Sequence, residues 1–223
     1  MSKLIEARGL YYQTDSGALV FEGLDAEFYA GEKAAIIGPL GSGKAALLRL
    51  LMGLDRPQKG RVYLFGKEID ALKRFELDTL RQGIGIVFEN ASLISNLKVV
   101  ENVMLPLQYH TDLTLDAVME RAVSLLESVG YRGDVWALPG PLPSYTKKTI
   151  ALARAMVLDP AIMIYDRLME GLDMHQSLQL LKFADAFHKA KKDRLSIIIA
   201  NDEGDIKDTM PDRILHIENR RLF

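Results

Sequence analysis

The chain has 223 residues, 48% of them hydrophobic and 26% charged, and can bury the core of one large domain or two small ones. Its 28 lysines and arginines against 30 aspartates and glutamates argue against a broadly basic surface for nucleic acid. There is no cysteine, which excludes disulfides, thiolate metal sites and a cysteine nucleophile. The first residues lack the apolar core of a signal peptide, and no apolar run is long enough to cross a bilayer, so we expect any membrane contact to come through a partner.

Short apolar segments alternate with helical patterns along most of the chain, which is typical of an α/β protein. The segments predicted as strands are residues 4–7, 24–29, 34–37, 61–64, 84–88, 161–165, 196–200 and 213–217. Three of them are continuously apolar, namely 34–37, 161–165 and 196–200. This composition predicts parallel strands that are buried on both faces.

The middle third of the chain has a helical pattern instead. Between residues 99 and 130 one helical face carries Leu115, Val118, Met119, Ala122, Leu125, Leu126 and Val129. Thr114 fits the N-cap of this helix, and Gly130 is placed to end it. The pattern predicts a helical subdomain at about residues 90–147, inserted in a single domain that spans residues 1–223.

A glycine-rich stretch follows the apolar run 34–37 and leads into a segment with helical leucine spacing. Residues 38–44, GPLGSGK, match the phosphate-binding pattern G-x-x-x-x-G-K-[ST], but Ala45 stands where serine or threonine should hold magnesium. In such a loop, backbone N–H groups at a helix N-terminus surround the phosphates. The alternative is a strand-to-helix turn without a ligand, which the order of strand, loop, lysine and helix disfavours. The candidate nucleotide-binding residues here are Gly38, Gly41, Ser42, Gly43, Lys44, Ala45 and Ala46.

Asp166 ends the apolar run 161–165. An aspartate in this position is usually a turn or helix cap, but proteins with a phosphate-binding loop place a magnesium-organising carboxylate at the end of such a strand. Because the loop is present upstream, we expect Asp166 to hold magnesium, directly or through water. Losing the hydroxyl at position 45 need not abolish nucleotide binding, since the phosphates and Asp166 can still hold the ion.

Four stretches carry a family resemblance over essentially the whole length of the chain. They are GEKAAIIGPLGSGKAALLRLLMGLDRPQKGRVYLFGKEI, IGIVFENASLISNLKVVENVMLPL, TIALARAMVLDPAIMIYDRLMEGLD and DRILHIENRRLF. Together they resemble the nucleotide-binding (ATPase) subunits of ABC transporters. Within that family, FENASLISNLKVVENVMLPLQYHTDL and LLESVGYRG are most similar to the ATPase subunits of MCE-type phospholipid transporters.

The resemblance implies a fold as well as a function. It implies a P-loop NTPase core, in which a mostly parallel sheet is flanked by helices. It also implies an N-terminal antiparallel β subdomain and an inserted helical subdomain. The P-loop, Asp166 and Asn201 are then expected to converge at the carboxyl ends of the parallel strands.

The resemblance also assigns roles that several residues of this chain cannot fill. Ala45 replaces the magnesium-ligating hydroxyl, and Glu89 stands where the family's Q-loop has glutamine. Arg167 occupies the place of the catalytic glutamate, and Asn201 that of the switch histidine. An arginine cannot accept a proton, and loss of a positioned base typically costs about 10²–10⁴ in rate.

The family's LSGGQ signature corresponds to Leu142, Pro143, Ser144, Tyr145 and Thr146. Both glycines are gone, so the backbone could not closely approach the γ-phosphate of an opposite subunit. The D-loop, which includes Asp173, is intact. Tyr12 is the candidate for stacking on adenine, although the usual register points to Thr14.

Two of the replaced residues have alternative interpretations. Arg167 could pair with the γ-phosphate and favour a bound, unreactive state, or it could pair with Asp166 or Glu170. Glu89 could be a spare metal ligand, but a polar loop residue is the preferred interpretation.

The sequence therefore predicts an ATP-binding subunit of an ABC-type transporter, similar to those for phospholipids and impaired in hydrolysis. The alternatives are a slow but functional transport ATPase and a regulatory or scaffolding P-loop protein without a transport role. An unrelated P-loop kinase is disfavoured, because neither its lid nor its arginines can be identified. The expected cofactors are ATP and weakly held magnesium. The expected partners are an integral-membrane permease and a second ATPase subunit, in a homodimer or a heterodimer, on the cytoplasmic face of the membrane.

Overall fold

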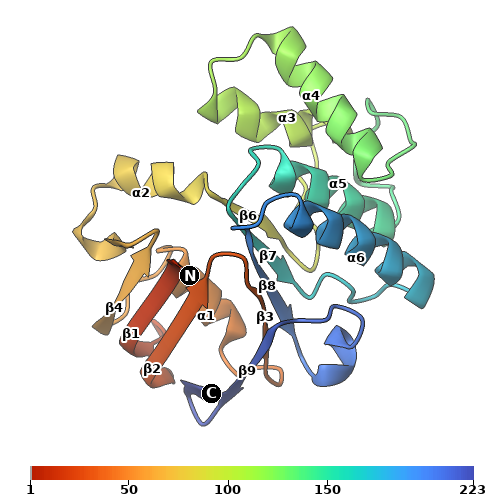
Figure 1. The fold of residues 1–223 in the computed structure, drawn as a ribbon. Helices are drawn as coiled ribbons and strands as arrows, with labels where there is room; N and C mark the ends of the chain where they lie inside the picture. The colour runs from red at the N-terminus through yellow and green to blue at the C-terminus, as the bar shows by residue number, and fades with distance from the viewer. Residues whose placement is uncertain (1) are drawn as a thin grey trace. The chain divides into compact units, whose positions relative to one another are not determined.

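The computed structural model describes residues 2–223, which form two compact units. The first unit contains residues up to Arg81 together with Lys192–Phe223, and the second contains Gln82–Lys191. Figure 1 labels the α-helices and the longer strands of both units.

An antiparallel sheet forms one layer of the first unit. Its strands, in spatial order, are β2 (Leu19–Tyr29), β1 (Lys3–Gln13), β4 (Lys59–Leu64) and β5 (Lys67–Glu68). Ala7 of β1 pairs with Ala26 of β2 and Val62 of β4, and all three are buried. The strands β1 and β2 extend beyond the predicted ranges 4–7 and 24–29, because their outer parts continue the hairpin with fewer buried side chains.

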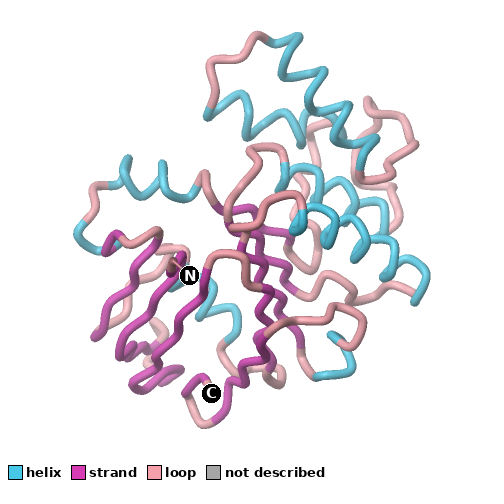
Figure 2. Tube along the Cα trace, in the orientation of Figure 1, coloured by secondary structure: helices cyan, strands magenta, loops and turns pink. Residues whose placement is uncertain are grey.

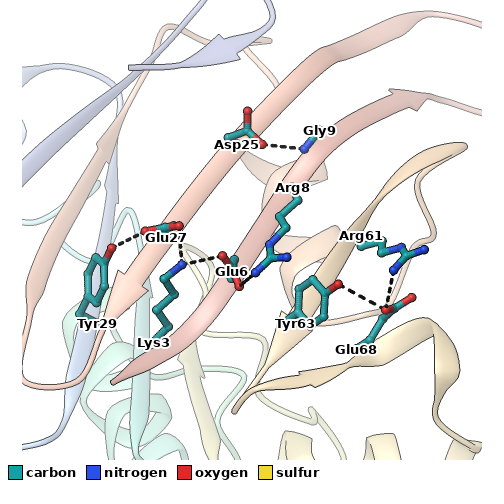
Figure 3. A network of polar contacts seen from close by, with 10 residues as sticks. All are labelled: Lys3, Glu6, Arg8, Gly9, Asp25, Glu27, Tyr29, Arg61, Tyr63 and Glu68. Carbon is teal, nitrogen blue, oxygen red and sulfur yellow. Dashed lines mark hydrogen bonds and ion pairs between the residues drawn. The ribbon is translucent and has the colours of Figure 1, made fainter. Parts of the chain in front are cut away.

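The polar face of this sheet carries a chain of ion pairs, which Figure 3 shows from close by. Lys3 Nζ donates to Glu6 Oε1 at 2.7 Å and to Glu27 Oε1 at 2.6 Å, while Arg8 Nη2 donates to Glu6 Oε2 at 2.9 Å. The Glu6 side chain is largely buried between its two cations. Hydrogen bonds from Arg8 and then from Lys3 hold the pKa of Glu6 at about 2.

Glu6→Gln is expected to lower the free energy of unfolding by about 1 kcal/mol at pH 7, because the partner cations are partly solvated. The folded pKa of about 2 lies below the ordinary 4.5, so the ionised carboxylate stabilises the fold above pH 4.5, and this contribution is lost as the pH falls towards 2. Urea unfolding should therefore show a gap between wild type and variant that narrows with acidification. The exposed Glu22→Gln is the control, and a gap independent of pH would contradict the account.

A parallel layer completes the sheet structure of the first unit. Strand β3 (Lys33–Ile37) lies between β8 (Leu195–Ala200) and β9 (Arg213–Glu218) and is parallel to both, and β9 continues into a hairpin with β10 (Arg221–Leu222). Nearly every residue of β3 and all of β8 are buried, as predicted for continuously apolar strands. The helical segments of this unit are α1 (Lys44–Leu51), η1 (Ile69–Ala71), α2 (Arg74–Arg81) and η2 (Glu203–Ile206).

The second unit combines two parallel strands with four helices, which Figure 2 draws in magenta and cyan. The strands are β6 (Ile84–Val87) and β7 (Ile162–Asp166), paired in parallel. The helices are α3 (Val99–His110), α4 (Leu115–Ser128), α5 (Ser144–Met156) and α6 (Met174–Lys189). Helix α5 packs against β6, α3, α4 and α6.

Helix α4 lies where the sequence predicts it. Thr114 caps it by accepting a hydrogen bond from the Ala117 N–H, and Gly130 follows its end with a φ of 82°. Val118 and Leu126 on the predicted apolar face are buried, whereas Leu115 at the start of that face is 63% exposed. Leu115 is the first residue of the helix and directly follows the exposed loop at residues 112–114. Among the described residues, no helix is long and apolar enough to span a membrane.

Candidate nucleotide site

The loop between β3 and α1 presents a helix N-terminus without a capping side chain. Gly43 is the N-cap of α1 and makes no side-chain cap, and no acidic residue lies in the first turn. Gly43 has a φ of 100°, which disfavours any residue with a side chain, and a Cβ on it would lie 2.6 Å from Val20 Cγ1. Both the backbone conformation and the lack of space therefore require glycine here. The first-turn N–H groups are therefore suited to an anion such as phosphate.

Ser42 and Lys44 complete this loop with two further donors. The Ser42 Oγ is buried and has no hydrogen-bond partner among the described residues, and a Cβ on Gly38 would lie 2.5 Å from it. Lys44 Nζ donates to the carbonyl oxygen of Gly38 and, at 2.9 Å, to that of Pro39. A buried hydroxyl without a partner is costly, and an oxyanion in the loop would satisfy it.

A cavity of about 560 Å³ lies beside α1 in the same unit and is bordered by Tyr12, Thr14, Ala46, Arg49 and Asp55, among others. The Tyr12 hydroxyl donates to Asp55 Oδ2 at 2.9 Å, and Arg49 Nε donates to the same oxygen at 2.7 Å. The hydrogen bond to Asp55 raises the pKa of Tyr12 and fixes its ring. Both candidates for base stacking, Tyr12 and Thr14, thus face one cavity.

Asn201 lies at the same end of the parallel strands as the phosphate-binding loop. Ile37 of β3 pairs with Ala200 of β8, so Gly38 and Asn201 leave the sheet at adjacent positions. The Asn201 N–H donates to Asp205 Oδ2 at 3.1 Å, while its Oδ1 is buried without a hydrogen-bond partner among the described residues. This part of the expected convergence lies within the first unit. An amide there can donate or accept a hydrogen bond but cannot take up a proton at neutral pH.

Strand pairing in the second unit brings Glu89 and Arg167 together. Val87 of β6 pairs with Tyr165 of β7, so the residues that follow both strands leave at the same end. Arg167 Nη2 forms an ion pair with Glu89 Oε2, and Arg167 Nε lies 3.7 Å from Asp166 Oδ1. The sequence suggested Asp166 or Glu170 as the partner of Arg167. In the structure Asp166 lies beside Arg167, and Glu89 is a further partner that the sequence did not suggest. The sequence did contain a signal for this pair. Relative to the family pattern, position 89 carries a negative charge and position 167 a positive one.

The loop after Asp166 is held by a buried lysine that the sequence reasoning missed. Lys148 of α5 is 1% exposed, and its Nζ donates to the carbonyl oxygens of Leu168 at 2.8 Å, Glu170 at 2.7 Å and Arg167 at 3.2 Å. Burial lowers the pKa of Lys148, with Glu89 and then Glu170 opposing that shift. The sequence signal that could have revealed this buried lysine was its position on the apolar face of α5, four residues before Leu152.

The segment after Glu89 is also fixed by a side chain of α5. Arg154 donates to the carbonyl oxygens of Ala91 and Ser92, both at 2.8 Å. Ala91 and Ser92 have φ values of 61° and 43°, a conformation that costs non-glycine residues energy and needs such support. Burial lowers the pKa of Arg154.

The signature and D-loop positions have ordinary structural roles in this chain. Helix α5 begins at Ser144 with Pro143 as N-cap, and no residue from 143 to 146 has a positive φ. The Tyr145 hydroxyl donates to Gln179 Oε1 of α6 at 2.8 Å. Asp173 caps α6 by accepting from the Gln176 N–H at 2.8 Å. Residues 143–146 thus lack the open backbone that two glycines would provide.

The residues at the predicted magnesium positions do not fit that ion. Magnesium prefers an octahedral shell of oxygen ligands. Ala45 offers a methyl group, and the carboxylates of Glu89 and Asp166 face the guanidinium of Arg167. No group of three or more His, Asp or Glu side chains suited to a metal ion exists among residues 2–223.

Comparisons with known proteins agree with this architecture. Residues 21–169 match the family model described as ABC transporter. The lipoprotein-releasing system ATP-binding protein LolD of Acinetobacter baylyi is 32% identical, over 98% of this chain and 97% of its own. The intermembrane phospholipid transport system ATP-binding protein MlaF of Haemophilus influenzae is 29% identical, over 89% of this chain and 75% of its own.

Two solved structures share the fold. The ATP-binding cassette MJ0796, solved as a dimer with ADP and phosphate, has a TM-score of 0.87 at 23% identity, over 98% of this chain and 96% of that one. The cbiO1 protein of Clostridium perfringens, described as part of the ABC transporter complex cbiONQ, has a TM-score of 0.86 at 26% identity, over 100% of this chain and 88% of that one. The predicted fold class is thereby confirmed, and the chain belongs to the ABC transporter family as an ATP-binding subunit.

Proposed function

We propose that this subunit binds ATP and hydrolyses it at no more than background rate. The observation that carries the proposal is the ion pair between Arg167 and Glu89. At the position of the family's general base stands a guanidinium that cannot accept a proton. The carboxylate nearest to it is already engaged in that ion pair.

Nucleotide binding is supported by the loop of residues 38–45. Its uncapped helix N-terminus, the Ser42 hydroxyl, which lacks a partner within residues 2–223, and the Lys44 ammonium are all donors, and they need no catalytic side chain to bind phosphate. We assign the base to the cavity beside Tyr12 and Ala46.

Equilibrium binding of a fluorescent ATP analogue tests this proposal. Wild type is expected to bind, and Lys44→Ala to bind at least about tenfold more weakly, because a charge-assisted contact to phosphate is worth about 1.5–3 kcal/mol. Lys67→Ala, on an exposed strand, is the matched control and should bind as wild type. Absence of binding by wild type would favour the scaffolding alternative.

The similar proteins support a proposal for the partner and for the class of substrate. We propose that the chain docks on an integral-membrane permease at the cytoplasmic face of the membrane, paired with a second copy or another ATPase subunit. Relatives named for lipoprotein release and for phospholipid transport support a lipid-type substrate. A relative named for methionine import, MetN of Leifsonia xyli, supports a polar solute instead; it is 31% identical over 100% of this chain and 65% of its own. Co-purification with a permease that extracts labelled phospholipid from membranes would support the lipid assignment. Co-purification with a permease for a polar solute would contradict it.

A further inference from the structure

We propose that Asp55 is a positioning residue for the nucleotide, because it holds the Tyr12 ring and the Arg49 guanidinium as two planar walls of the base-binding cavity. The base then contacts both planar groups, and Tyr12 rather than Thr14 is the residue on which it stacks. This inference rests on the proposed function, since it concerns the cavity to which the base is assigned. All of these residues belong to the first unit.

The carboxylate of Asp55 joins two segments that are far apart in the chain, β1 and α1. Its Oδ2 accepts from the Tyr12 hydroxyl at 2.9 Å and from Arg49 Nε at 2.7 Å, and its Oδ1 accepts from Arg49 Nη2 at 2.5 Å. The paired bonds from Arg49 fix the plane of the guanidinium. They also lower the pKa of Asp55, so the carboxylate stays ionised at neutral pH. One carboxylate thus sets the positions of both planar groups.

The backbone on either side of Tyr12 is held by Gln58, which directly precedes β4. The Gln13 N–H donates to Gln58 Oε1 at 2.8 Å, and Gln58 Nε2 donates to the carbonyl oxygen of Gln13 at 3.1 Å. The Gln58 N–H donates to the carbonyl oxygen of Tyr11 at 2.9 Å. Tyr12 is therefore held through both neighbouring residues and through its hydroxyl. A ring that is already fixed loses little conformational freedom when a base binds to it.

Thr14 borders the same cavity but is less suited to a base. Its Oγ1 accepts from the Ala18 N–H at 3.2 Å and lies 2.8 Å from Ser16 Oγ, so the hydroxyl is used within its own turn. A threonine also has no planar group on which a base could stack. These contacts favour Tyr12 over Thr14 as the stacking residue.

Arg49 is placed to meet a base whose phosphates lie in the loop before α1. It shares a face of the helix with Ala46, and both residues border the cavity. It lies about 9 Å beyond Gly43 along the helix axis, a separation that a ribose and a phosphate can span. The Arg49 side chain is 54% exposed, so a base can reach it. A guanidinium stacks on the faces of aromatic rings, and its permanent positive charge adds to the attraction.

Competition binding by ATP and by inorganic tripolyphosphate tests the role of Asp55. Both compounds are used to displace a ribose-labelled fluorescent ATP analogue, but tripolyphosphate has no base and reports on the phosphate-binding loop alone. Asp55→Asn keeps the size of the side chain and removes the charge that holds Arg49. It should weaken ATP binding by about tenfold, within the range of a stacked base, and change tripolyphosphate binding by less than about twofold.

Further variants separate the planar contacts from charge. Arg49→Lys keeps the positive charge without the plane, so it should weaken ATP by about fivefold and leave tripolyphosphate unchanged. Tyr12→Leu should lose about tenfold for ATP, whereas Tyr12→Phe keeps the ring and should recover part of that loss. Asp193→Asn, at an exposed position of the first unit, is the control for loss of a carboxylate and should bind both compounds as wild type does.

Three outcomes would overturn the inference. Equal ATP binding by wild type and Asp55→Asn would remove the role of Asp55 and leave nucleotide binding itself in place. Equal weakening of ATP and tripolyphosphate by Asp55→Asn would show that the substitution acts on the phosphate-binding loop instead of the base. If wild type binds neither compound, the proposed function fails, and this inference fails with it.

Discussion

Lys148→Met is expected to lower the free energy of unfolding by about 3 kcal/mol, because the carbonyl oxygens of Arg167, Leu168 and Glu170 lose their buried donor. Methionine has a similar length and removes the cost of burying the ammonium, which keeps the effect below the sum of three lost hydrogen bonds. For a chain of this size the melting temperature should fall by about 6–12 °C. Urea unfolding followed by circular dichroism measures the free energy.

The neighbouring lysine is a matched control for this substitution. Lys147 Nζ donates to the carbonyl oxygen of Gly140 at 2.8 Å in an exposed contact. Lys147→Met should therefore change the free energy of unfolding by no more than about 0.5 kcal/mol. Equal effects of the two substitutions would show that Lys148 does not hold the loop.

Restoring catalysis is expected to require the opposing surface as well as the P-loop side. Ala45→Thr, Arg167→Glu and Asn201→His together should leave turnover low in a homodimer, because residues 143–146 still lack glycines. Arg167→Glu would also place a third carboxylate beside Glu89 and Asp166, so Glu89→Gln must accompany it. Adding Ser-Gly-Gly-Gln at residues 143–146 to these four changes should raise turnover by about 10² or more, the typical value of a backbone donor that stabilises developing charge in the transition state.

The order in which these changes are added is itself informative. The signature replacement alone, on the wild-type background, is expected to have no effect on phosphate release, since Arg167 remains at the position of the base. Full activity from the four P-loop-side changes without the signature replacement would contradict the role given to residues 143–146. Melting temperatures of each variant separate lost catalysis from lost folding.

The strands could be predicted because each buried parallel strand is continuously apolar, as in β3 and β8. The start of α4 could be predicted equally well, since the side chain of Thr114, which caps the helix N-terminus, is adjacent to it in sequence. The pairing of Glu89 with Arg167 was not, because it depends on β6 lying beside β7, a contact between segments far apart in the chain. Lys148 shows the same limit: a lysine on an apolar helix face is unusual, but only the fold reveals the carbonyl oxygens that it binds.

The two-residue strands β5 and β10 were missed for a different reason. A period of two cannot be recognised in two residues, and these strands exist because they continue the hairpins of β4 and β9. The arrangement of Asp166 relative to the P-loop stays a prediction. The loop and Asn201 are already adjacent at the ends of β3 and β8.

Phosphate release by the purified wild-type protein, with Lys44→Ala measured in parallel as a control for contaminating ATPases, tests the central claim most directly. Lys44 Nζ donates to the carbonyl oxygens of Gly38 and Pro39 in its own loop, and its side chain is only partly buried, so Lys44→Ala should spare the fold. Both proteins are expected to release phosphate at the same background rate, although wild type binds ATP. Robust release by wild type that disappears in Lys44→Ala would contradict it and establish a functional transport ATPase.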